Sequence, residues 1–90
     1  MKVSAASITN ENAGTLLEQG LASIGSGDVA IDLAGVTTVD SAAVALLLAW
    51  QRAAAKQGKR LALTGVPAGI TSLAELYGVD SLLELSAAKA

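Results

Sequence analysis

The sequence predicts a single α/β domain, with a mixed, mostly parallel sheet of about four strands and helices packed mainly on one face. Three observations support this. Short segments in which apolar and polar residues alternate are followed along the chain by segments in which apolar residues recur at helical spacing. The helical segments begin at capping residues and end at glycines. Finally, 90 residues are too few for helices to cover both faces of a sheet. We therefore expect one domain over residues 1–90.

The N-terminal half is predicted to form two strands around one helix. Residues 2–8 alternate weakly between apolar and polar side chains and are interpreted as a short strand. Thr9 and Asn10 offer capping side chains for a helix over residues 11–24, which a Gly-Ser-Gly segment ends. Residues 28–33 form the clearest strand, with Val, Ile and Leu at alternate positions.

The C-terminal half continues the alternation. A helix is predicted over residues 41–57, with Gly58 as its C-terminal cap. Residues 60–64 form the next strand, and Pro67 suits the first turn of the helix that follows. A last short strand is expected at residues 81–85. Strands and helices in this order favour parallel pairing through right-handed crossovers.

Composition excludes several functions. The chain has no cysteine and no histidine, so it offers no disulfide, thiolate nucleophile, imidazole base or common zinc site. Its net charge is −2, and its densest basic group, Lys56, Lys59 and Arg60, is interpreted as a helix end. Nucleic acid is therefore not expected as a partner. We predict no catalytic residues, no cofactor and no metal site.

Apolar residues make up 52% of the chain but form no membrane span. The longest uninterrupted apolar run covers residues 42–50, whereas a spanning helix needs about 20 residues. The N-terminal segment lacks the apolar core of a signal peptide. We therefore expect a cytoplasmic protein that does not insert directly into a membrane.

The candidate site is the dipeptide Asp40-Ser41, where a strand passes into the helix over residues 41–57. Functional groups of open α/β sheets collect at such turns. Asp40 is a strong helix N-cap, and Ser41 would then place its hydroxyl beside the positive end of the helix. An ordinary helix cap is the more common explanation of such a pair, and both interpretations can hold together.

The helix over residues 41–57 is apolar nearly all round. One stripe, containing Leu47, is predicted to face the sheet. A second stripe contains Ala43, Leu46 and Trp50, and it meets either the neighbouring helix or a partner protein. Because tryptophan is enriched at interface hot spots, Trp50 is included in the candidate surface. The residues predicted to bind a partner are Asp40, Ser41, Ala42, Ala43, Leu46 and Trp50.

Residues 28–85, and more faintly 3–24, resemble the STAS domain family, which has the fold of the bacterial anti-sigma factor antagonists. The resemblance rests on the strand ending in Asp32-Leu33, the Val39-Asp40-Ser41 turn and the apolar helix after it. The segment LALTGVPAGITSLAELYGVD is most similar to the MlaB-like branch. The family implies a STAS-like sandwich. Most members begin with an additional strand before the one predicted at residues 2–8, and we expect this chain to lack most of that strand.

The resemblance implies a non-catalytic binding subunit. In the MlaB-like branch, such subunits dock on the ATPase of a phospholipid-transport ABC system that maintains outer-membrane lipid asymmetry, and they stabilise or regulate it. The alternative is an anti-sigma factor antagonist, in which a serine kinase would phosphorylate Ser41. Ala42 and Ala43 stand where both branches usually have a glycine. This departure weakens the case for phosphorylation more than the case for docking.

Overall fold

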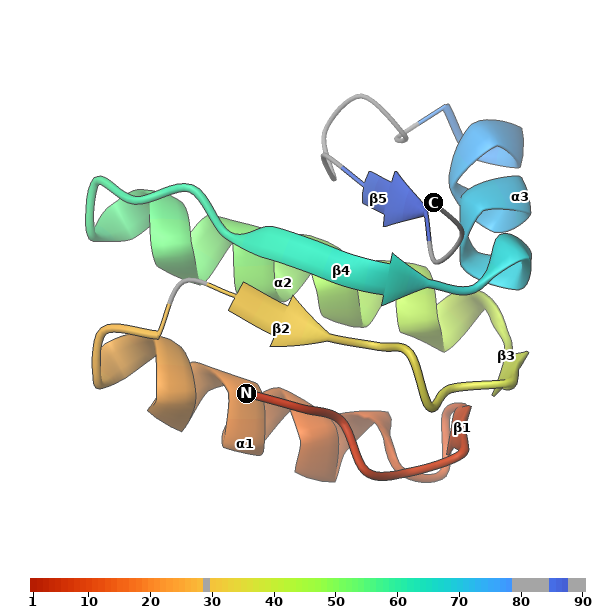
Figure 1. The fold of residues 1–90 in the computed structure, drawn as a ribbon, viewed down its shortest axis with the longest axis horizontal. Coiled ribbons are helices and arrows are strands. Elements are labelled where there is room, and N and C mark those ends of the chain that lie inside the picture. Colours follow the sequence, from red (N-terminus) through yellow and green to blue (C-terminus); the bar gives the residue numbers. More distant parts are fainter. Residues whose placement is uncertain (29, 79–84, 88–90) are drawn as a thin grey trace.

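The computed structural model describes residues 1–28, 30–78 and 85–87. It contains the predicted alternation of strands and helices, with one additional short strand, β3, before the second helix (Figure 1). Residues 81–84, predicted as part of the last strand, lie outside the described residues. The elements in chain order are β1 (Ser7–Ile8), α1 (Ala13–Gly25), β2 (Ala30–Asp32), β3 (Thr38–Val39), α2 (Ser41–Lys56), β4 (Ala62–Val66), α3 (Ala68–Leu76) and β5 (Leu85–Ala87).

The strands form two small sheets, where a single sheet of about four strands was expected. One sheet has the order β2-β4-β5 and the other pairs β1 with β3, and all pairings among the described strands are parallel. The N-terminal segment runs beside both sheets, because Lys2 bridges Asp32 and Ser7 pairs with Thr38. Between these two pairs the register shifts by one residue. A turn closed by the Val36 N–H and the Leu33 carbonyl interrupts the ladder there.

The helices α1 and α2 lie side by side on one side of the β2-β4 sheet (Figure 1). The strands alternate accordingly. Ile31 and Leu63 are fully buried, whereas Ala30, Ala62 and Thr64 are exposed on the other side. Both helices follow a strand and return the chain antiparallel to it, so α1 and α2 run in the same direction and their N-termini lie at the same end of the domain (Figure 1).

The core fills the space between α1, α2 and the strands. Its largest fully buried side chain is Trp50, and Leu47 is equally inaccessible, as predicted for the sheet-facing stripe of α2. Two large apolar side chains of the other helices lie largely outside the core. Leu21, on α1, is 40% exposed, and Tyr77, the C-cap residue of α3, is 52% exposed. On α1 the buried positions are instead Leu16, Gly20 and Ile24.

The cap of α1 also differs from the prediction. Asn12 occupies the N-cap position instead of Thr9 or Asn10. Its side chain forms two hydrogen bonds with the turn that precedes the helix. The Asn12 amide accepts from the Thr9 N–H at 2.9 Å and donates to the Ser7 carbonyl at 2.8 Å. This turn therefore ties β1 to the start of α1. None of the helices in the described part of the chain is long and apolar enough to cross a membrane.

Candidate functional site

The site begins at the N-terminus of α2, where Asp40 is the N-cap as predicted. Its backbone is extended (φ −126°, ψ −171°), and one carboxylate oxygen, Oδ1, accepts from the Ala42 N–H at 2.8 Å. Ser41 is the first residue of the helix. The local sequence therefore determines this end of α2, because a capping carboxylate satisfies an N–H group that the helix cannot.

Asp40 also joins α2 to the turn before α1. Its second oxygen, Oδ2, accepts from the Asn10 N–H at 3.2 Å, and its own N–H donates to the Ile8 carbonyl at 3.2 Å. Both carboxylate oxygens are thus engaged within the domain. Asp40 holds the two helix starts in place, and this positions the neighbouring Ser41.

Ser41 is exposed, and its hydroxyl forms no hydrogen bond with any described residue. It stands at the positive end of a helix of 16 residues, so an acceptor or an anion on a partner would find a favourable local field there. The sequence predicted that the Ser41 hydroxyl faces outward, and in the structure this residue is exposed.

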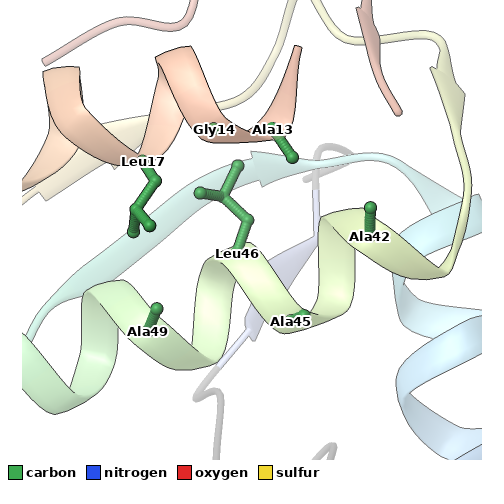
Figure 2. Close-up of a pocket in the computed structure, with 7 residues that line it drawn as sticks. All are labelled: Ala13, Gly14, Leu17, Ala42, Ala45, Leu46 and Ala49. Atoms are coloured by element: carbon green, nitrogen blue, oxygen red, sulfur yellow. The ribbon is translucent and has the colours of Figure 1, made fainter. Parts of the chain in front are cut away.

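An apolar groove lies between α1 and α2, and its lining includes Ala42, the residue that follows Ser41 (Figure 2). Its volume is about 220 Å³. The α1 wall consists of Ala13, Gly14 and Leu17. The α2 wall consists of Ala42, Ala45 and Ala49, and the side chain of Leu46 projects between the helices (Figure 2). Small residues on both walls keep this hollow open to solvent.

The second stripe of α2 does not form an outer surface. Ala43 and Trp50 are fully buried and Leu46 is 4% exposed. Trp50 packs against Gly20 of α1. The indole Nε1 of Trp50 donates to the Leu17 carbonyl at 3.3 Å. The prediction that Trp50 and Ala43 contact a partner is therefore wrong for this folded state, and Leu46 keeps a place only in the lining of the groove.

The structure thus keeps part of the predicted surface and adds to it. Ser41 is exposed, and Asp40 and Ala42 are half-buried beside it. The groove residues that the sequence analysis missed are Ala13, Gly14, Leu17, Ala45 and Ala49. A signal was available, because alanines at positions 42, 45 and 49 recur at helical spacing and Gly14 stands within a helix.

The carboxylates near the strand ends have local structural roles. Asp28 accepts from the Ala30 N–H at 3.1 Å and Asp32 from the Ala34 N–H at 2.8 Å, each two residues ahead. Asp40 makes the same contact with Ala42. The three carboxylates therefore close separate turns. Within the described residues, no three acidic side chains come together in a group able to hold a metal ion.

A family model described as "Mlab, STAS domain" matches residues 4–84, which includes the whole of α2, the Asp40-Ser41 turn and both walls of the groove. No curated protein matches the chain.

Proposed function

The chain belongs to the STAS domain family in its MlaB-like form, and from this premise we propose that it is a binding subunit that docks on the ATPase of a phospholipid-transport ABC system. STAS domains are generally non-catalytic binding domains. On this proposal the protein supplies a surface to the ATPase and carries out no chemistry itself.

The observation that carries the proposal is the exposed Ser41 hydroxyl, whose neighbour in the chain, Ala42, lines an apolar groove. The hydroxyl offers a donor and an acceptor, and the adjoining alanines offer apolar surface that a partner can bury. A hydrogen-bonding group beside a small apolar patch is a typical protein-binding arrangement. In the proposed complex, Ser41, Ala42 and Ala45 contact the ATPase, whereas Asp40 fixes their position.

Docking would regulate the ATPase through linkage. A subunit that binds only the folded and assembled ATPase stabilises that form, by an amount that depends on its concentration relative to Kd. The rigid frame of the site favours this role, because the groove walls lie on two helices packed together, and little order has to be gained on binding.

The test is co-purification with the ABC ATPase of the phospholipid-transport system encoded in the same genome. The tagged chain and the ATPase are co-expressed and analysed by size-exclusion chromatography, and we expect one co-eluting complex. Ser41→Arg places a long charged side chain at the contact and should abolish co-elution. Ala55→Arg, at an exposed position of α2 outside the groove, is the matched control and should retain it.

Separate elution of the wild-type chain and the ATPase at micromolar concentrations would overturn the proposal. Equal retention of the ATPase by both variants would remove Ser41 from the contact. Circular dichroism of each variant establishes that any loss of binding does not come from unfolding.

A second candidate function is that of an anti-sigma factor antagonist, and the free Ser41 hydroxyl is the observation that favours it. A kinase can reach this exposed side chain, and a phosphate there would lie at the positive end of α2. The intact mass of the protein purified from its native cells distinguishes the two candidates. A phosphate that disappears in Ser41→Ala supports the switch, and its absence under all growth conditions counts against it.

A further inference from the structure

The groove between α1 and α2 has charged edges as well as an apolar lining, and together they specify an occupant. We propose that it receives an amphipathic helix of the partner, with aliphatic side chains directed into the groove and lysine or arginine residues along the side that faces α1. This inference rests on the proposed docking function and names the part of the partner that docks.

The shape of the groove fits a helix. Its walls are two helices that run side by side in the same direction, so the hollow between them is elongated along their axes (Figure 2). Ala42, Ala45 and Ala49 form one row along α2, and Gly14 opens the facing wall. A row of small residues lets a third helix approach closely and insert larger side chains between the two walls.

The charges around the groove are mostly negative. Glu18 lies one helical turn beyond Gly14, on the same face of α1, and is exposed. Glu11 is exposed in the turn before α1, and α1 itself contains no basic residue. The Asp40 carboxylate lies at the same end. On the opposite edge, Arg52 follows Ala45 by two turns of α2.

The α1 edge of the groove is therefore negatively charged, and the α2 edge carries a positive charge at Arg52. A helix in the groove gains attraction from basic residues over α1 and would be repelled there by acidic ones. Arg52 favours a neutral or acidic residue on the other flank near the far end of the groove. This charge pattern selects a basic amphipathic helix over an acidic one and orients it between the two walls.

Trp50 provides a built-in reporter of occupancy. It is the only tryptophan of the chain. Its indole N–H donates to the carbonyl of Leu17, a residue that lines the groove. A helix that presses on Leu17 therefore changes the surroundings of the indole, and its emission changes without any added label.

The experiment titrates the intact protein with two tryptophan-free peptides of 18 residues. Both carry the same leucine stripe, flanked by lysine in one peptide and by glutamate in the other. We expect a saturable change in Trp50 emission with the lysine peptide, and binding weaker by about tenfold or more with the glutamate peptide at low salt.

Two pairs of variants locate the binding. Ala45→Leu fills the groove and should abolish the response, whereas Ala55→Leu, at an exposed alanine of α2 outside the groove, should leave it unchanged. Glu18→Lys should weaken the lysine peptide about tenfold and strengthen the glutamate peptide. Glu75→Lys, which makes the same charge change at an exposed position of α3, should do neither.

Equal affinity for the two peptides, or a response that survives Ala45→Leu, would overturn the inference. A protein dimer that Ala45→Leu dissociates would also overturn it, because the groove would then belong to a second copy of the chain. These outcomes are independent of the ATPase. If the ATPase co-elutes while the peptide tests fail, only the inference about the helix is contradicted. If the ATPase does not co-elute, the proposed docking function itself is contradicted.

Discussion

The indole ring of Trp50 lies directly against the backbone of Gly20. A Cβ atom at position 20 would lie 2.7 Å from Trp50 Cζ2 and closer still to Nε1 and Cε2. Gly20 is buried in the middle of α1, where glycine is normally unfavourable. The missing side chain makes room for the largest side chain of the core, and this lets α1 and α2 pack together.

This contact predicts that Gly20→Ala is destabilising although alanine is the better helix former. The added methyl group forces the indole to move within a packed core, at a cost of about 1–3 kcal/mol. Urea unfolding followed by circular dichroism measures the change in the free energy of unfolding. Gly14→Ala, at an open position of the same helix where a Cβ meets no atom within 4 Å, should be neutral or stabilising. Equal effects at both positions would contradict the observed packing.

Burial predicts a large contrast between two leucines. Leu47 is fully buried, and Leu47→Ala should cost about 2–5 kcal/mol because it leaves a cavity between α2 and the sheet. Leu76, on α3, is 76% exposed, and Leu76→Ala should change the free energy of unfolding by no more than about 0.5 kcal/mol. Thermal melts of the two variants provide the comparison, and the reverse order would show that the assigned faces are incorrect.

The two bonds of the Asp40 carboxylate predict a measurable capping contribution. Asp40→Ala removes the acceptor for the Ala42 and Asn10 N–H groups and should lower stability by about 0.5–2 kcal/mol. Asp40→Asn keeps one acceptor oxygen and should lose less. If chemical denaturation gave the same midpoint for wild type and Asp40→Ala, the carboxylate would not be the cap in solution.

The hydrogen bonds of Asp28 predict a loss of stability in acid. The Met1 ammonium group and the Ser23 hydroxyl both donate to Oδ2, and these bonds, with the one from the Ala30 N–H, hold the pKa of the Asp28 carboxyl well below its ordinary value of 3.8. The folded state thus binds this proton less readily than the unfolded state. The contribution of Asp28 to the free energy of unfolding is therefore complete above pH 3.8, the ordinary pKa of the carboxyl. It is lost as the pH falls below that value.

Urea midpoints at neutral pH and near pH 3 check this prediction. The difference between them should be smaller in Asp28→Asn, which cannot bind the proton, than in the wild type. An identical acid dependence of the two proteins would show that Asp28 makes no contribution.

The turn at Asp40-Ser41 was predictable because its causes are local. An aspartate followed by an apolar helical stretch accounts for the cap at Asp40 and the helix start at Ser41 within a few residues of chain. The buried position of Leu47 follows from helical periodicity in the same way. The N-cap of α1 was misplaced because Thr9, Asn10 and Asn12 all have capping side chains. The Asn12 side chain forms hydrogen bonds within the preceding turn and not to the first turn of the helix, so capping chemistry alone does not identify it.

By itself, the sequence determined the α/β class, the alternation of elements and the outward Ser41, since each depends on residues close together in the chain. Only the tertiary structure decided that Trp50 turns inward, because its space comes from Gly20 and its hydrogen-bond acceptor from Leu17, both on another helix. The groove likewise arises only when the alanine row of α2 meets the start of α1. Periodicity shows that a helix face is apolar, but the packing of a second element determines whether that face is covered.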